Sequence, residues 1–178
     1  LLDQPNNQGD TLSYFDILGA RWKETFNMSQ LGQLIVGVDY DELSGELERV
    51  SEAATASNSE NKKFRSPTFE LTSPYLAVSQ GIQLTQSLEV VPSLGVRYYQ
   101  HNQFKDISTS QAGLSVNYHD LTLFANFASG GNYPGLDVTT LAYLIPALGE
   151  TWQELEAETL DHKEIGIKYA FSAQTRFD

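Results

Sequence analysis

The chain has 178 residues, of which 40% are hydrophobic and 11% aromatic, so it is long enough for one sizeable domain and too apolar for a disordered chain. Its net charge of −12 argues against nucleic acid as a partner, because contacts with phosphate need Lys and Arg. The absence of cysteine excludes disulfide bonds and thiolate metal sites. The first residues, LLDQPNNQGD, lack the basic start, apolar middle and cleavage site of a signal peptide. No apolar run reaches the roughly 18–20 residues of a membrane-spanning helix, but a membrane β-barrel needs no such run.

Alternation of apolar and polar residues predicts strands along most of the chain, because successive side chains of a strand point to opposite faces. In the clearest case, Leu94 and Val96 alternate with Ser93, Arg97 and Tyr99. Seven strands are expected, at about 11–25, 33–42, 68–82, 88–99, 111–118, 121–127 and 164–169.

The connections between these strands alternate in length. Because neighbouring strands are expected to be antiparallel, the long loops would lie at one end of the sheet and the short joints at the other, which is typical of a transmembrane β-barrel. The long and medium loops are expected at 43–66, 101–108 and 130–161, and the short joints at 27–32, 83–87, 119–120 and 171–174.

Charged residues on the polar face indicate what each face contacts. Glu89, Arg97, Glu164 and Lys168 would be costly in a dry core, whereas a water-filled lumen accommodates them. We therefore expect the apolar face to contact outer-membrane lipid and the polar face to line a lumen.

The predicted fold is all-β: an antiparallel, up-and-down transmembrane barrel to which this chain contributes about seven to eight strands. If the short joints are periplasmic, the first strand descends, whereas an intact bacterial barrel starts and ends in the periplasm. The last residues, RFD, resemble the beginning of an eighth strand. We therefore expect residues 1–178 to be a segment of a larger barrel.

Two other interpretations stay open at this point. A passive small barrel or porin would need a complete barrel with both termini in the periplasm. A soluble β-sandwich or lipocalin-like binding module would need the apolar face of 88–98 to be a protein core.

Five residues are candidates for contact with a small-molecule ligand. Arg97 and Tyr99 lie high on the polar face, His101 flanks the following loop, and Tyr133 and Trp152 are placed to close over the same mouth. Aromatic rings stack on planar ligands, and Arg pairs with anionic ones. The alternative for the aromatic residues is an interfacial girdle or loop packing. No second ligand is fixed that would make His101 a metal site.

No catalytic or metal-binding motif is visible, so we expect neither enzymatic activity nor a cofactor. His119 and His162 are isolated, and GGNYPG at 130–135 leads to Pro134 instead of the helix that a nucleotide-binding loop needs. The loop at 130–161 is acidic but lacks the ligand spacing of a Ca²⁺ site. Within it, TTLAYLIPALGETWQEL predicts a short helix interrupted by Pro146.

Three stretches resemble the barrel of TonB-dependent outer-membrane receptors: PSLGVRYYQHNQF, GLSVNYHDLTLFANFASGGNYPGL and LEAETLDHKEIGIKYAFS. Their order and spacing, more than any single motif, carry the resemblance. It implies a barrel of about 22 strands occluded by an N-terminal plug, in the bacterial outer membrane. Its function would be the uptake of a scarce nutrient such as a ferric siderophore, driven by TonB. No plug and no C-terminal barrel strand are recognisable in 1–178, so the activity and the TonB contact are expected of the whole receptor.

Overall fold

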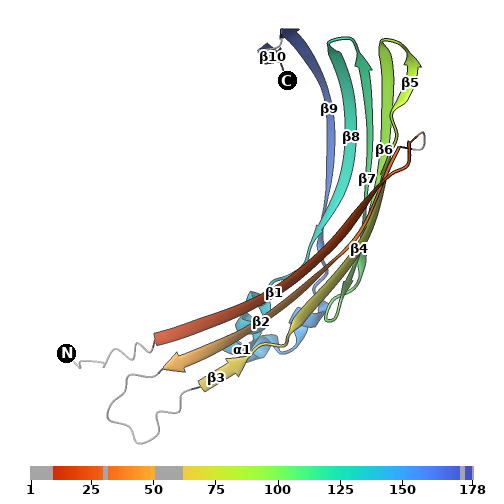
Figure 1. Cartoon of the computed structure of the whole chain (residues 1–178). Coiled ribbons are helices and arrows are strands. Elements are labelled where there is room, and N and C mark those ends of the chain that lie inside the picture. The colour runs from red at the N-terminus through yellow and green to blue at the C-terminus, as the bar shows by residue number, and fades with distance from the viewer. Residues whose placement is uncertain (1–9, 30–31, 51–61, 173–174, 178) are drawn as a thin grey trace, which may run out of the picture.

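The computed structural model describes residues 10–29, 32–50, 62–172 and 175–177, which form one curved antiparallel sheet (Figure 1). Its neighbouring strands follow the order β1-β2-β4-β6-β7-β8-β9-β10. β3 pairs with β2 and β5 pairs with β6, so β3, β4 and β5 together occupy one position in this order. The strands are β1 (Asp10–Asn27), β2 (Gln33–Val50), β3 (Lys62–Arg65), β4 (Phe69–Ser79), β5 (Ile82–Thr85), β6 (Leu88–His101), β7 (Ile107–Tyr118), β8 (Leu121–Asn132), β9 (Glu158–Ser172) and β10 (Thr175–Phe177).

The short and long connections lie at opposite ends of the sheet, as the sequence predicts (Figure 1). β7 and β8 are joined by only His119 and Asp120, and His119 takes the left-handed conformation (φ 52°) that a tight hairpin requires. At the other end, the segment from 133 to 157 carries α1 (Asp137–Leu144) and two 3-10 turns, η2 (Pro146–Leu148) and η3 (Thr151–Glu154). The helix is interrupted at Pro146, as predicted.

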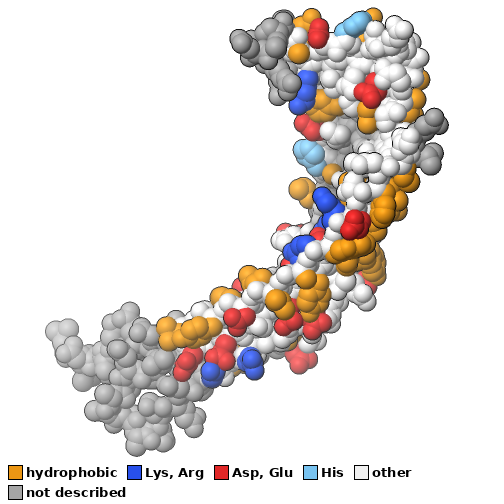
Figure 2. All heavy atoms as spheres, in the orientation of Figure 1, with side chains coloured by type: hydrophobic (Ala, Val, Ile, Leu, Met, Phe, Trp, Pro, Cys, Tyr) orange, Lys and Arg blue, Asp and Glu red, His pale blue; other side chains and the backbone are white. Residues whose placement is uncertain are grey.

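The two faces of the sheet differ in polarity, and the register confirms the predicted assignment. Leu94 of β6 pairs with Ala112 of β7, and Leu123 of β8 pairs with Ile167 of β9, so these side chains share one face. Figure 2 shows hydrophobic side chains along the convex side of the middle of the sheet, where basic side chains lie toward the concave side. The convex face therefore corresponds to the expected lipid-facing surface.

Two levels of aromatic residues bound the apolar band of the convex face. Tyr98 lies near the long-loop end and marks the upper level. Tyr118 and Tyr169 lie at the short-turn end and mark the lower level; all three are exposed. Tyr118 pairs with Leu88, ten residues before Tyr98 in β6. At about 3.3 Å per residue and a strand tilt of about 40°, this separation spans about 25 Å along the barrel axis, the height of the apolar band in outer-membrane barrels.

Beyond the upper aromatic level the polarity of the two faces is reversed. On the convex face, Glu42 pairs with Glu70, and Glu46 forms an ion pair with Lys63. On the concave face, Leu43 pairs with Phe69. In β2, β3 and β4 the outer part of the sheet therefore extends beyond the apolar band, with a polar convex face and an apolar concave face, whereas β1 keeps apolar side chains on its convex face there.

This extension corrects the predicted loop boundaries. The loops expected at 43–66 and 130–161 were too long: β2 continues to Val50, β3 begins at Lys62, β8 continues to Asn132, and β9 begins at Glu158. Residues 51–61 lie outside the described part of the chain. The short joints expected at 83–87 and 171–174 also begin later, because β5 reaches Thr85 and β9 reaches Ser172. The acidic residues of these strands have the local composition of a loop. They form strand because their backbone groups hydrogen-bond to neighbouring strands, and local polarity does not reveal this pairing.

The apolar core lies on the concave side of the outer extension. Phe69, Phe104 and Leu136 are buried together, and Leu43, Tyr133, Val138 and Trp152 pack against them. A Cβ at Gly45 would lie only 3.3 Å from Leu136 Cδ1, so glycine at this position lets the 133–157 segment approach β2 closely. This segment is therefore packed against the inner wall at the mouth of the sheet.

The assignment of the two faces can be tested with adjacent residues of β6 that point to opposite sides. Leu94→Arg should destabilise the membrane-inserted receptor by about 2–4 kcal/mol, because it places a charge near the bilayer midplane. Ser93→Arg, on the concave face, should cost much less. Urea unfolding of the full receptor in lipid vesicles measures both values, and equal costs would contradict the assignment.

Candidate functional site

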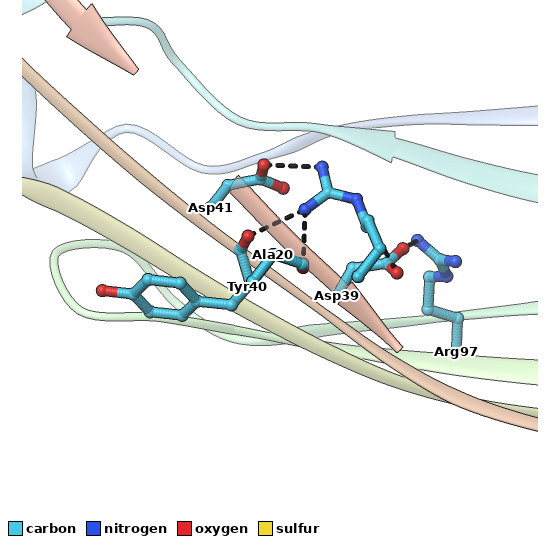
Figure 3. Close-up of polar contacts among 6 residues, drawn as sticks. Ala20, Asp39, Tyr40, Asp41 and Arg97 are labelled. Atoms are coloured by element: carbon cyan, nitrogen blue, oxygen red, sulfur yellow. Dashed lines mark hydrogen bonds and ion pairs between the residues drawn. The ribbon is translucent and has the colours of Figure 1, made fainter. Parts of the chain in front are cut away.

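A chain of ion pairs crosses the concave wall below the apolar core (Figure 3). Arg21 of β1 contacts Asp41 of β2 (Nη2 to Oδ1, 2.6 Å) and lies 3.7 Å (Nε to Oδ1) from Asp39. Arg97 of β6 contacts the second oxygen of Asp39 (Nη1 to Oδ2, 2.9 Å). Asp39 therefore bridges two guanidinium groups from strands that are not neighbours.

The register explains how these residues meet. Arg21 and Asp39 are direct cross-strand partners in β1 and β2. Arg97 must reach across β4, where the partner of Asp39 is Ser73, a small residue that is only 2% exposed. A small side chain in β4 leaves room for the long Arg97 side chain to reach Asp39.

Arg97 also lies between two tyrosine rings. Its Cζ atom is 4.4 Å from the centre of the Tyr75 ring and 5.7 Å from that of Tyr99. A Cβ at Gly37 would lie 2.3 Å from Tyr75 Cζ, so glycine allows the Tyr75 ring to lie against β2. Cation–π contacts and the Asp39 ion pair thus fix the position of the guanidinium group.

A cavity of about 380 Å³ opens beside this guanidinium group. It is lined by two cationic side chains, two tyrosines and several neutral polar groups, and no carboxylate is among its lining residues. The arrangement offers charge-assisted hydrogen bonds and ring stacking to an anionic ligand. The lining includes Lys23, Tyr75, Arg97, Tyr99, Thr109 and Gln111.

The other three candidates belong to an aromatic cluster formed by Phe69, His101, Phe104, Tyr133 and Trp152. The His101 ring lies 4.7 Å from the Tyr133 ring and 5.3 Å from the Phe69 ring, and the Trp152 ring lies 6.0 Å from the Phe69 ring. The Tyr133 hydroxyl donates to the carbonyl oxygen of Lys105 (3.0 Å). This is the loop packing that the sequence left as an alternative for Tyr133 and Trp152.

His101 is held as a neutral, packed residue. It is 8% exposed, and its Nδ1 atom accepts a hydrogen bond from the backbone N–H of Gln103 (3.0 Å). Burial lowers the pKa of His101, and the nearby Asp106 carboxylate partly opposes this change. Among the described residues, no group of three or more His, Cys, Asp or Glu side chains is placed to hold a metal ion.

The structure thus divides the five candidates into two groups. Arg97 and Tyr99 line the cavity, whereas His101, Tyr133 and Trp152 secure the 133–157 segment to the wall. Sequence reasoning missed Lys23, Asp39 and Tyr75 as parts of the site. Their places in the alternation of β1, β2 and β4 put them on the polar face, but the pattern cannot show which strands bring them together.

A family model described as TonB dependent receptor-like, beta-barrel matches residues 2–178. The chain belongs to the TonB-dependent receptor family. Such receptors are transporters of the bacterial outer membrane, not enzymes, and they work with TonB to move ligands inward. Membership of this family sets aside the porin and the soluble β-sandwich. No curated protein and no solved structure matches the chain.

The barrel strands of this receptor family account for the polarity of the sheet. The convex face meets lipid, and the concave face, with the Arg97 cavity, meets the lumen. No helix in the described part of the chain is long and apolar enough to cross a membrane.

The receptor topology can be tested by cysteine labelling, since residues 1–178 contain no cysteine of their own. Lys63→Cys and Glu150→Cys should react with an impermeant maleimide on intact cells, because both lie at the long-loop end. Asp120→Cys, in the opposite turn, should react only after the outer membrane is permeabilised. Labelling of Asp120→Cys on intact cells would contradict this orientation.

The bridging role of Asp39 predicts unequal effects of two similar substitutions. Asp39→Asn should destabilise the receptor by about 1–3 kcal/mol, because it weakens two charge-assisted contacts of a side chain that is 14% exposed. Asp41→Asn removes one contact of a side chain that is 37% exposed and should cost less than about 1 kcal/mol. Urea unfolding in lipid vesicles measures both, and a larger cost for Asp41→Asn would show that Asp39 is not the bridge.

Proposed function

We propose that this receptor takes up an anionic iron complex, with a ferric siderophore as its ligand class. The observation that supports the proposal is the Arg97 cavity, in which Lys23 and Arg97 supply positive charge and Tyr75 and Tyr99 supply aromatic surface. Many ferric siderophores combine a negative charge with planar iron-binding groups. Both features match the chemistry of this wall.

The acidic balance of the chain does not oppose an anionic ligand at this position. Glu42, Glu46 and Glu70 lie on the convex face of the outer extension, away from the lumen. The side chains of Glu154 and Glu156 in the 133–157 segment are exposed. These carboxylates therefore lie outside the cavity, where water and salt screen them, and Asp39, which lies beside it on the concave wall, is paired with Arg21 and Arg97.

Transport would be carried out by the whole receptor. In this view the sheet is one part of the wall of a barrel of about 22 strands, and a plug closes the lumen. TonB would act through the plug, and the Arg97 cavity would contact the ligand from the side. The anchored 133–157 segment would limit the approach to the cavity from outside.

Replacement of the central charge provides the test. Arg97→Gln should weaken binding of an anionic ferric siderophore to the purified full receptor by about tenfold or more, because it removes a charge-assisted contact of about 1.5–3 kcal/mol. Quenching of intrinsic fluorescence over a panel of catecholate, carboxylate and hydroxamate complexes measures the affinity.

Lys168→Gln is the matched control. Lys168 also lies over an aromatic ring, that of Phe124 (5.5 Å), but on strand β9 and outside the Arg97 cavity. It should leave the affinity unchanged. Unchanged affinity in a folded Arg97→Gln receptor would remove this cavity from the site. Saturable binding of a neutral sugar alone, with no ferric complex bound, would overturn the proposed ligand class.

A further inference from the structure

A second cavity, of about 210 Å³, lies at the mouth between α1 and the concave face of β1, β2 and β3. Leu47 and Leu136 are 6% and 3% exposed and form fixed parts of its wall. The Phe64 ring stacks on Tyr143 of α1 at 4.4 Å and holds the helix against β3. The apolar lining comprises Phe15, Leu47, Phe64, Leu136, Leu141 and Leu144.

The chemistry of this mouth cavity differs from that of the Arg97 cavity. No Lys or Arg is among its lining residues; Asp137 is acidic, and the side chain of Glu46 points to the convex face. Glu46 forms an ion pair with Lys63, and the Ser66 hydroxyl hydrogen-bonds with the backbone of Gly45 (3.0 Å). The cavity therefore offers no positive charge to an anion, and its apolar surface suits an uncharged group.

The size of the mouth cavity sets a limit on what it can hold. A dry apolar cavity of about 150 Å³ is large enough for benzene, so this cavity has room for one six-membered ring. Leu141 and Leu144 are each 50% exposed and Phe15 is 59% exposed, so its rim is open. A ring can therefore enter from the open side and contact Phe15 and Phe64 edge-on or face-on.

The mouth cavity is well separated from the Arg97 cavity along the wall. Gly45 lines the mouth cavity, and Gly37, eight residues earlier in β2, pairs with Tyr75, which itself pairs with Arg97. Eight residues of strand span about 26 Å. A compact ligand cannot fill both cavities at once and would meet the outer one first.

We propose that the mouth cavity binds an uncharged aromatic ring of the incoming ligand, as a first contact before the Arg97 cavity. The evidence for this aromatic-ring site, the ring site, is the apolar lining of the cavity. Its part in uptake rests on the proposed function. A neutral aromatic probe therefore tests the ring site without any iron complex.

The probe is fluorobenzene, observed by ¹⁹F NMR with the full receptor in lipid nanodiscs and with empty nanodiscs as the reference for partitioning into lipid. The wild-type receptor should show a saturable bound component. Thr140→Phe places a ring in the cavity and should weaken this component at least tenfold. Leu148→Phe adds the same ring on the same segment outside the cavity and should not change it.

Several results would overturn the ring site. One is the absence of a saturable component in the wild type, and another is equal binding by Thr140→Phe and Leu148→Phe. If Thr140→Phe does not fold, Leu141→Trp at the half-exposed rim takes its place with the same expectation. Loss of ferric siderophore binding with fluorobenzene binding intact would count against the proposed function and not against the ring site.

Discussion

A sheet that is one layer thick has two faces, and each must be matched to its own surroundings. In this chain the convex face is apolar between two levels of aromatic residues, and on β2 and β4 it becomes acidic beyond the level at the long-loop end. The concave face is polar below the upper level and apolar above it. This exchange of polarity between the faces, near Tyr40 and Glu42 of β2, determines where the membrane ends, where the core forms and where charged groups gather.

The reversal explains why a long connecting segment is ordered at the mouth. An apolar concave face above the membrane must be covered, and the segment from 133 to 157 covers it with Leu136, Tyr133 and Trp152. His101 also packs here, as a neutral ring whose Nδ1 atom accepts a hydrogen bond from the backbone N–H of Gln103. The segment therefore lies against the wall instead of projecting into water, and the lumen wall below it stays open.

The ion pairs below the core fix the positions of charged side chains that would otherwise be free to move on the surface of a single sheet. Asp39 is bound to Arg21 and Arg97 at the same time, and Tyr75 lies beside the Arg97 guanidinium. A side chain fixed in this way loses little further freedom when a ligand binds, which favours recognition. The wall therefore carries two different cavities. A ligand from outside would meet the apolar mouth cavity first and the cationic, aromatic Arg97 cavity second.

The sequence by itself determined where most of the strands lie, how they face and at which end each connection lies, because alternation and loop length are local properties. It also determined the break in the helix at Pro146 and the polar positions of Arg97 and Tyr99. It did not show that the strand expected at 68–82 is divided into β4 and β5. Only the tertiary structure decided that Leu43–Val50 is strand, because its acidic residues are paired with β1 and β3. The same holds for the contact of Arg97 with Asp39 across β4 and for the burial of His101 beside Tyr133. These contacts join residues that are distant along the chain, and the energy that places them comes from pairing and packing that no local pattern contains.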